Sequence, residues 1–308
     1  WIDSSIVVSN ELAREVKDLK ANQALTFNDE IIVFINNDFI NDFSNFEKIE
    51  TKSDPIKINN PWDIFSQNAR AIEEDFDLLT KEKISLPISK TNTILGDKNR
   101  IFLAEGANVE CSVLNTENGS IYIGKDAQIM EGCLVRGGLA MNEHSVLKMG
   151  AKIYGATTLG KYAKIGGEVN NSVIYDYSNK GHEGFLGNAV LGEWCNLGAD
   201  TNNSNLKNNY APVKLWSYKT ERFGQTGLQF CGLIMGDHAK SGINTMFNTG
   251  TVVGVAANIF GAEYPRNFLP SFTWGGTGNN KTFRMKQVLE MAEAMMNRRK
   301  IDLTKNDV

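Results

Sequence analysis

The residues best suited to chemistry in this sequence gather between positions 170 and 210. His182 stands between Gly181 and Glu183, in a stretch too rich in glycine to belong to a hydrophobic core. Because an imidazole titrates near neutral pH, this side chain could take a proton from an ammonium or amine and act as a general base. A solvated loop histidine without a catalytic role is the alternative that the residues alone leave open.

Asparagine crowds the segment that follows, at positions 196, 202, 203, 205, 208 and 209. These side chains could bind a polar ligand, or they could occupy left-handed corners and form ladders along a repeated structure. His144 and His238 fall at regular repeat positions and are predicted to lie on the surface. With three scattered histidines and no acidic cluster, we predict no metal site.

A six-residue repeat supplies the elements that must position these side chains. Steps of six from Ile123 to Ile165 fall on eight apolar residues in succession, and the register returns between Met235 and Ile259. The residue two places before each step is small at nearly every repeat, and glycine often follows the apolar residue. A period of six suits neither an α-helix nor a simple hairpin, but it suits a coil of short strands joined by tight turns.

We therefore predict a mainly β protein with a β-helix from about Ile101 to Ile259. The apolar residue of each hexad points inward and stacks on its counterpart in the next coil, while the small residue sits at a corner. Glycine or asparagine is expected to take the left-handed backbone angles. The register fails at Asn171, and we expect functional side chains near that break.

Glycine composition divides the chain. All 28 glycines lie between Gly96 and Gly278. We predict a partial α/β region over residues 1–95, the β-helix domain over 96–280, and a C-terminal helix and tail over 281–308.

The flanking regions are predicted to be partly helical. A short helix follows a cap at Ser9 or Asn10, a buried strand covers residues 31–35, and a helix covers 61–79. The last helix has an apolar face that packs against the β-helix or a neighbouring subunit rather than forming a binding groove. This face is formed by Met285, Val288, Leu289, Ala292, Met295 and Met296.

The composition excludes several classes of function. With a net charge of −4 the chain has no basic excess for nucleic acid. No apolar run approaches the roughly 18–20 residues of a membrane span, and the first residues lack the features of a secretory signal. The four cysteines are sparse, and none stands at CxxC spacing. We predict a reduced, cytoplasmic protein without nucleic-acid or membrane partners.

The segments SNKGHEGFLG, GEWCNLGADTNNSNLKNNY and GINTMFNTGTVVG resemble the acetyltransferase domain of one family. It is the bifunctional UDP-N-acetylglucosamine pyrophosphorylase/glucosamine-1-phosphate N-acetyltransferase family, in a divergent bacterial branch. The resemblance covers roughly residues 60–300. It implies a left-handed parallel β-helix, usually a homotrimer with active sites shared between neighbouring subunits. It also implies acetyl-CoA as acyl donor, a sugar phosphate as acceptor, and no metal at this site.

The family's site residues carry over position by position. His182 matches the catalytic base that deprotonates the sugar 2-amine for attack on the thioester. Glu168 matches an acidic residue that positions the sugar or the base, and Asn196 matches a substrate-binding asparagine. Phe185 stands where the family has a tyrosine, and Lys180 lies beside the base. Positions expected near coenzyme A are Ala199, Asn205, Gly242, Ala262 and Arg266.

The resemblance leaves a gap at the sugar phosphate. Tyr154 and Asn170 replace the arginine and lysine that the family places there. A phosphate needs cations or helix N-termini. Arg136, Lys152 or Lys180 could substitute, or the acceptor could be a different sugar.

Two features leave further alternatives open. The family carries a nucleotidyltransferase domain ahead of the β-helix, but its glycine-rich phosphate loop cannot lie before Gly96, so uridylyl transfer is expected only of a longer protein. The β-helix could then be an inactive trimerisation scaffold, or an acyltransferase for another sugar or acyl group. The insertion over residues 206–230 is predicted to leave the β-helix and either cover the site or contact a neighbouring subunit.

Overall fold

The computed structural model describes residues 1–278 and 280–304, and its contacts divide the chain into two compact units. The first unit runs from Trp1 to Gln67, and the second begins at Asn68. This division falls earlier than the boundary after residue 95 that the glycine composition predicts. The reason is that α3 (Asn68–Thr80) already binds the β-helix through Asn68 and Glu73, and that β6 (Thr93–Leu95) pairs with β9 (Val113–Asn115) inside it.

In the first unit a small sheet and one helix share a core. β2 (Gln23–Phe27) pairs with β3 (Glu30–Phe34) in an antiparallel hairpin and with β4 (Glu47–Glu50) in parallel, and β1 (Ile6–Val7) pairs with β5 (Ile56–Lys57). The predicted strand over 31–35 is confirmed as β3. Core side chains include Leu12, Leu25 and Ile32.

The helices of the leading region follow the predicted caps, with one interruption. Helix α1 (Asn10–Asp18) begins where predicted, because the Ser9 hydroxyl accepts a hydrogen bond from the Leu12 amide. The helix predicted over 61–79 is two helices, since α2 (Pro61–Ser66) ends before Gln67 and α3 (Asn68–Thr80) begins the second unit.

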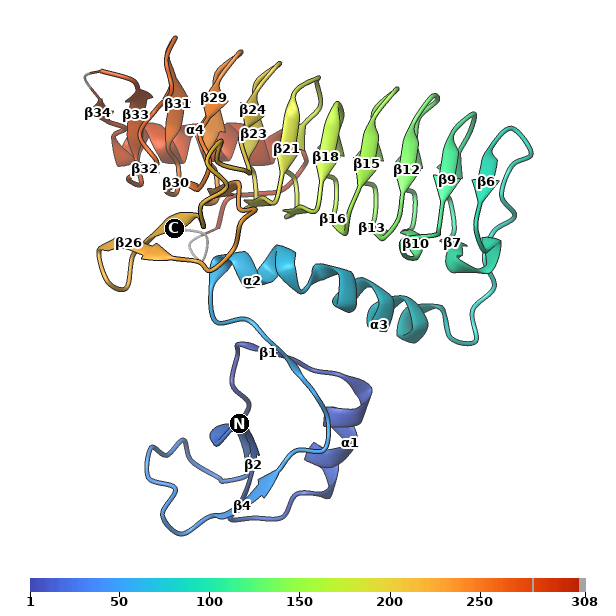
Figure 1. Ribbon diagram of the computed structural model, residues 1–308, viewed down its shortest axis with the longest axis vertical. Coiled ribbons are helices and arrows are strands. Elements are labelled where there is room, and N and C mark those ends of the chain that lie inside the picture. Colours follow the sequence, from blue (N-terminus) through green and yellow to red (C-terminus); the bar gives the residue numbers. More distant parts are fainter. Residues whose placement is uncertain (279, 305–308) are drawn as a thin grey trace. The chain divides into compact units, whose positions relative to one another are not determined.

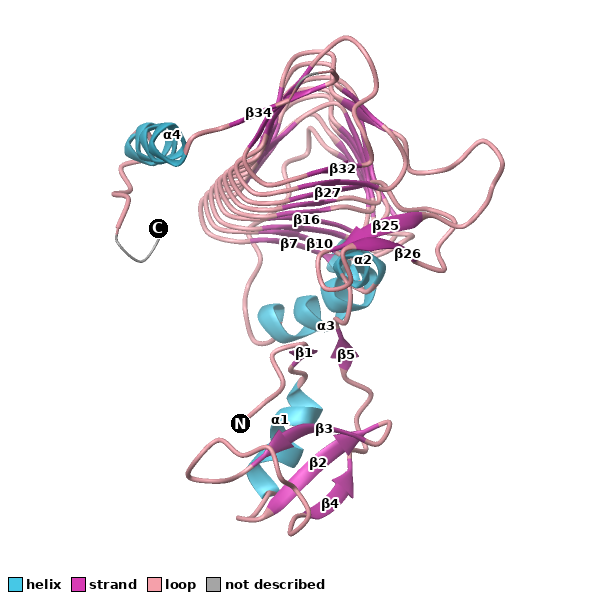
Figure 2. Ribbon diagram, turned by 90° about the vertical axis from the view of Figure 1, so that its left-hand side faces the viewer, coloured by secondary structure: helices cyan, strands magenta, loops and turns pink. Residues whose placement is uncertain are grey.

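The second unit is a parallel β-helix of the left-handed type with three flat faces, seen end-on in Figure 2. Each coil gives one short strand to each face in turn, and equivalent strands of successive coils pair in parallel. The predicted fold is confirmed. In Figure 1 the third face runs as a row of arrows from β6 to β21.

The strands of each face follow in chain order. Face one consists of β7 (Ile101–Leu103), β10 (Ile121–Ile123), β13 (Leu139–Met141), β16 (Thr157–Leu159), β19 (Val173–Ile174), β22 (Val190–Leu191), β27 (Leu233–Met235), β30 (Thr251–Val253) and β32 (Phe268–Leu269). Face two consists of β8 (Asn108–Val109), β11 (Gln128–Ile129), β14 (Val146–Leu147), β17 (Lys164–Ile165), β20 (Asn179–Lys180), β23 (Asn196–Leu197), β28 (Lys240–Ser241), β31 (Asn258–Phe260), β33 (Thr273–Gly276) and β34 (Lys281–Thr282). Face three consists of β6, β9, β12 (Leu134–Arg136), β15 (Lys152–Tyr154), β18 (Glu168–Asn170) and β21 (Phe185–Gly187), followed by the pair β24 (Asn202–Asn203) and β29 (Met246–Phe247). A short 3-10 helix (Lys98–Arg100) precedes β7.

The interior is filled by the hexad residues that the repeat predicts. Ile123, Ile129 and Val135 come from faces one, two and three of one coil and are buried in one continuous core. Each such side chain contributes about 1.5–3 kcal/mol when it leaves water. Stacked aliphatic rows therefore stabilise this unit.

The repeat does not end at Asn171, where the sequence register fails. The inward position moves from Ile165 to Val169, because Gly166 and Gly167 alone make the turn between them. β18 still pairs with β15 on one side and β21 on the other, so the coils continue without interruption. The register changes because this corner and the next one, at Asn171, are both shorter.

The prediction that glycine or asparagine takes the left-handed corners is only partly correct. Gly132, Gly150 and Asn244 do have positive φ. The corner between faces one and two mostly uses other residues. Those with positive φ there are Asp126, His144, Tyr162, Tyr177, Trp194, His238, Ala256 and Phe272.

The glycines that follow the inward residue are needed for close approach between coils. Gly124 does not have a positive φ, but a Cβ atom on it would lie 2.6 Å from the Met141 carbonyl oxygen of the next coil. At Gly160 the same Cβ would lie 2.4 Å from the Asp176 carboxylate. A side chain at either position would push successive coils apart.

Two segments of the second unit lie outside the coils: one packs on face one, and the other is an insertion between two coils. Helix α3 lies on face one, where the Asn68 amide donates to the Ala156 carbonyl and Glu73 accepts from the Ser120 amide. Residues 206–230 leave the β-helix as the antiparallel hairpin of β25 (Lys214–Ser217) and β26 (Arg222–Gln225). The predicted excursion is therefore present.

Helix α4 (Met285–Asn297) follows β34 and flanks the β-helix, as the end-on view of Figure 2 shows. Its buried residues Val288, Ala292 and Met296 belong to the predicted apolar face. Val288 packs with Ala256 of the β-helix. Met285, predicted on the same face, is exposed.

Two glycine-to-asparagine substitutions distinguish the two roles of glycine, which are to allow close approach between coils and to adopt a positive φ. Gly124→Asn should destabilise the unit by at least about 2 kcal/mol, because the new Cβ overlaps backbone of the next coil. Gly132→Asn should cost about 1 kcal/mol or less, since asparagine tolerates positive φ and a Cβ there meets nothing closer than 3.8 Å. Chemical denaturation of both variants measures the difference, and equal destabilisation would contradict it.

Candidate active site

His182 lies at the corner between faces two and three, in the loop from Gly181 to Gly184 that joins β20 to β21. The preceding coil makes room for this loop, because its corner contains only Gly166 and Gly167. A Cβ on Gly167 would lie 2.8 Å from the His182 carbonyl oxygen, and one on Gly184 would lie 2.2 Å from the Thr201 carbonyl oxygen. The glycines thus let a longer loop fit between two coils, with the His182 side chain exposed.

Lys180 holds this loop from inside the β-helix. It occupies an inward position, paired with Ile165, and its side chain is fully buried. The ammonium donates hydrogen bonds to the Gly166 carbonyl at 3.0 Å and to the His182 carbonyl at 2.7 Å. Burial lowers the pKa of Lys180 to about 8. Because its Nζ is bound to these two carbonyls, Lys180 positions the loop and does not present its charge to a substrate phosphate.

On the face-three side of the corner, Glu168 is fixed by a tyrosine. The Tyr154 hydroxyl donates to the Glu168 carboxylate at 2.6 Å, and burial together with that carboxylate raises the pKa of Tyr154 to about 12. Glu168 pairs with Phe185 across the next coil, and Asn170 donates to the Tyr154 carbonyl. These neighbouring coils bring together four of the positions singled out from the sequence.

On the face-two side, His182 lines a groove of about 1070 Å³ between the β-helix and helix α4. Asn196 and Ala199 line it too, so three of the predicted site residues share one cavity. A row of outward side chains forms its floor, because Lys164, Asn179, Asn196 and Lys240 pair in register on successive strands. Helix α4 contributes Met295, and the turn that follows it contributes Arg298 and Arg299.

The opposite wall of the groove belongs to an aromatic column at the corner between faces one and two. Tyr177 and Trp194 line the groove and stack with ring centroids 4.2 Å apart and planes 6° apart. The column continues through Tyr162 to His144 and beyond Trp194 to His238. Each of the two histidines, predicted to lie on the surface, is partly exposed and also takes part in this stack.

The remaining predicted site residues lie apart from the groove. The Asn205 amide donates to Asn188 close to Gly187. Gly242 packs directly on Gly198, where a Cβ would lie 2.5 Å away. Ala262 and Arg266 are exposed in the loop between β31 and β32. None of these four, and no residue of the 206–230 hairpin, lines the groove among the described residues.

The three cations suggested as phosphate ligands have other partners. Arg136 binds Asn118 and Glu117, Lys152 pairs with Glu183 at 3.4 Å, and Lys180 is buried. Sequence reasoning missed the cations that do line the groove, namely Lys148, Lys164, Lys240, Arg298 and Arg299. Lys164 and Lys240 could have been found one residue before the inward position of their hexads, and Lys148 one residue after it. Nothing in the local sequence places Arg298 and Arg299 beside them.

We also searched the described residues for metal sites and for membrane-spanning helices. Residues 1–278 and 280–304 contain no group of three or more histidine, cysteine or acidic side chains arranged to hold a metal ion. None of the helices in the same residues combines the length and the apolar character needed to cross a bilayer.

Comparisons with known proteins match both parts of the chain. Residues 1–84 match the family described as sugar nucleotidyl transferase. A bifunctional sugar-1-phosphate nucleotidylyltransferase/acetyltransferase of Sulfurisphaera tokodaii is 30% identical over 164 residues, covering 53% of this chain and 40% of that protein. The bifunctional protein GlmU of Methanocaldococcus jannaschii is 36% identical over 87 residues, 28% of this chain and 21% of its own length. The chain thus spans less than half of these curated relatives.

Similarity to solved structures is distant. The polySia-specific acetyltransferase NeuO gives a TM-score of 0.37 at 14% identity, covering 65% of this chain and 84% of its own. AntD, an N-acyltransferase from Bacillus cereus in complex with dTDP and 3-hydroxybutyryl-CoA, gives 0.27 at 13% identity, covering 68% and 91%.

The buried ammonium of Lys180 predicts a pH dependence of stability. Its pKa is about 8 in the folded protein against 10.5 for a solvated lysine, so the unfolded chain binds more protons between these values. The free energy of unfolding of the wild type should therefore rise with pH across this window, by roughly 1–3 kcal/mol relative to Lys180→Met. Lys240, which also has a pKa of about 8, is present in both proteins and cancels.

Urea denaturation of both proteins at pH 7.5, 9 and 10.5 measures this difference. Parallel curves would contradict the burial of a charged Lys180.

Proposed function

Because the chain is a divergent relative of the bifunctional sugar-1-phosphate nucleotidylyltransferase/acetyltransferases, we propose that it transfers an acetyl group from acetyl-CoA to an amino sugar. The acceptor is the 2-amine of glucosamine-1-phosphate. The observation that carries the proposal is the placement of His182. It stands on a loop held from below by Lys180, between the groove on face two and Glu168 on face three.

His182 acts as the general base in this proposal. It takes a proton from the sugar amine as the nitrogen attacks the thioester carbonyl, so that a C–N bond forms and the C–S bond breaks. The proton passes to the departing thiolate. A positioned base contributes about 10²–10⁴-fold to such a reaction, and holding both substrates together supplies much of the rest. No covalent enzyme intermediate is required.

The neighbouring residues bind and orient the substrates. Glu168, held by the Tyr154 hydroxyl, positions the sugar or the imidazole. Asn196 and Phe185 contact the sugar from the two sides of the corner. The Ala199 backbone and the Asn205 amide are the groups proposed to lie near the thioester, where an amide can stabilise the developing oxyanion. Gly242, Ala262 and Arg266 are proposed contacts of coenzyme A farther along the β-helix.

A homotrimer is the proposed assembly. In that assembly Asn205, Arg266 and the 206–230 hairpin, which lie outside this groove, would meet a neighbouring subunit. Light scattering should then give roughly three times the chain mass of 34.1 kDa. A monomer would contradict the shared site.

A second function belongs to the longer protein. The match of residues 1–84 to sugar nucleotidyl transferases favours a nucleotidyltransferase domain of which this chain holds the end, with the β-helix also serving as its trimerisation scaffold. Pyrophosphate release by the longer protein would test this.

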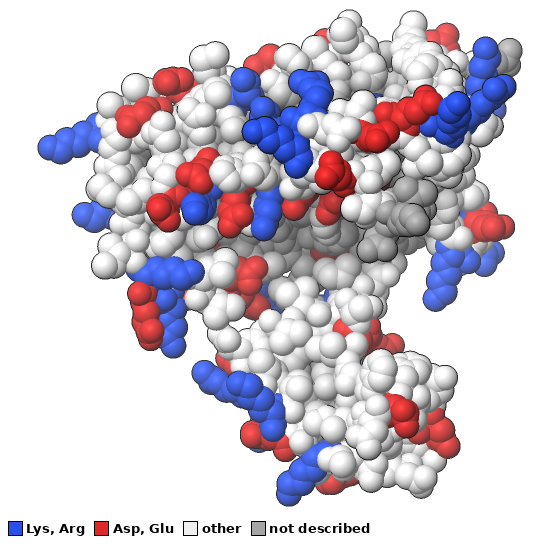
Figure 3. All heavy atoms as spheres, turned by 180° about the vertical axis from the view of Figure 1, so that it is seen from behind, with Lys and Arg blue, Asp and Glu red and all other residues white. Residues whose placement is uncertain are grey.

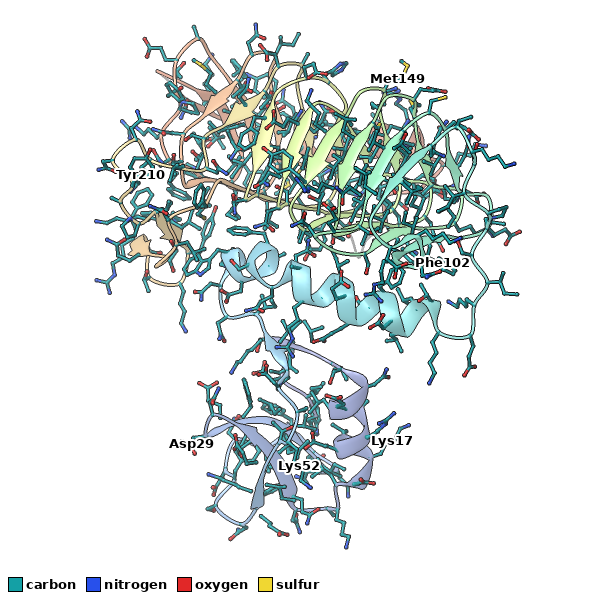
Figure 4. The ribbon with its side chains drawn as sticks, turned by 45° about the vertical axis from the view of Figure 1, so that its right-hand side comes forward. Lys17, Asp29, Lys52, Phe102, Met149 and Tyr210 are labelled. Carbon is teal, nitrogen blue, oxygen red and sulfur yellow. The ribbon has the colours of Figure 1, made fainter. Side chains whose placement is uncertain are left out.

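The acetyl transfer is tested by following thiol release from acetyl-CoA in the presence of glucosamine-1-phosphate. His182→Ala should lower kcat/KM by about 10²–10⁴-fold. Met149→Ala is the matched control, because Met149 is exposed at the same corner two coils earlier and points away from the β-helix (Figure 4). It should stay within about twofold of the wild type.

Two results would contradict this function: no thiol release by the wild type, or release that His182→Ala leaves unchanged.

A further inference from the structure

The groove beside His182 holds cations without partners. Lys148, Lys164, Arg298 and Arg299 line it, and within residues 1–278 and 280–304 none of them has an ion pair or a side-chain hydrogen bond. Several other cations of the same β-helix are paired. Examples are Lys125 with Glu105, Lys161 with Glu143 and Lys152 with Glu183.

These four cations converge on one another. No aspartate or glutamate is among the described residues that line the groove. The pKa of Lys164 is lowered by burial and then by Arg299, Lys148 and Arg298, so these groups lie close enough to repel it. Figure 3 shows the side of the molecule that carries α4, where basic side chains gather near the middle of its upper part. Such repulsion is relieved when an anion binds between the cations.

Helix α4 is fixed to the β-helix at its other end. Phe283 and Val288 pack with Ala256, with Phe272 and Met291 beside them. Ala292 and Met296 are buried along the same face, which carries the end of the helix to the groove. A helix C-terminus favours basic residues by about 0.3–1 kcal/mol, which accounts for Arg298 and Arg299 alone. It does not account for Lys148 and Lys164 on the β-helix opposite them.

The floor and walls of the groove suit a polar, phosphorylated ligand. The outward amides of Asn179 and Asn196 lie between Lys164 and Lys240 on adjacent strands. The Lys240 ammonium donates one of its three hydrogens to the His238 carbonyl and borders the site. Arginine binds phosphate through two parallel hydrogen bonds, and lysine adds a point charge.

We propose that Arg298, Arg299, Lys148 and Lys164 form a phosphate subsite in this groove. The inference rests on the proposed acetyl transfer and adds to it the groups that recognise the phosphorylated substrate. The phosphate belongs either to the amino sugar or to the acyl donor, because both carry one and both must reach His182. In either case a segment at the end of the chain selects the substrate.

Binding without turnover tests the subsite. Calorimetry on the full chain carrying His182→Ala uses two separate probes, glucosamine-1-phosphate and adenosine 3′,5′-bisphosphate. We expect Arg298→Gln/Arg299→Gln to weaken one of them by about 10- to 100-fold, as loss of charge-assisted phosphate contacts predicts. Arg284→Gln/Lys286→Gln, which removes two cations from the start of the same helix, is the control and should leave both affinities unchanged.

The two probes distinguish the sources of phosphate. Weaker binding of the sugar phosphate alone assigns the subsite to the acceptor, and glucosamine without phosphate should then bind equally to variant and parent. Weaker binding of the bisphosphate alone assigns it to the donor. If neither affinity changes, or if the control variant weakens binding equally, the subsite is overturned. A failure of acetyl transfer would leave these binding results intact, so the two proposals fail separately.

Discussion

Each coil of the β-helix must satisfy its backbone hydrogen bonds through the next coil, which lies about 4.8 Å away. That requirement stacks every residue on its counterpart in the neighbouring coil. Inward positions become continuous aliphatic rows, as at Ile129, Leu147 and Ile165. Outward positions become rows of like chemistry, and corners become columns. The polar floor of the groove is one such row, and the aromatic wall is one such column.

The site lies where the number of residues in the corners changes while the strands of successive coils remain paired. Gly166 and Gly167 shorten one corner to two residues, and the equivalent corner of the next coil has four residues again and carries His182. The interior row on face two is then interrupted by Lys180 instead of an aliphatic residue. A buried ammonium is costly unless its donors are satisfied. The Lys180 ammonium donates to the carbonyls of Gly166 and His182. These two hydrogen bonds hold the His182 loop against the preceding coil.

Much of the architecture could be predicted from the sequence, because a strict period leaves few structures that fit it. The hexad from Ile123 to Ile165 fixed which side chains are inside. The aromatic column could not be predicted, since the left-handed corners were expected to need glycine or asparagine. Stacking with rings above and below compensates Tyr162, Tyr177 and Trp194 for positive φ. The position of Arg298 and Arg299 depends on how α4 packs. The residues around Arg298 and Arg299 do not predict that packing.

The most direct test of the proposed acetyl-transfer site is a crystal structure of the His182→Asn variant soaked with coenzyme A and glucosamine-1-phosphate. The sugar 2-amine should lie within hydrogen-bonding distance of residue 182 and face the coenzyme A sulfur, with a phosphate against Arg298 and Arg299. A sugar bound away from this corner, or an empty groove with ligands bound elsewhere on the β-helix, would contradict it.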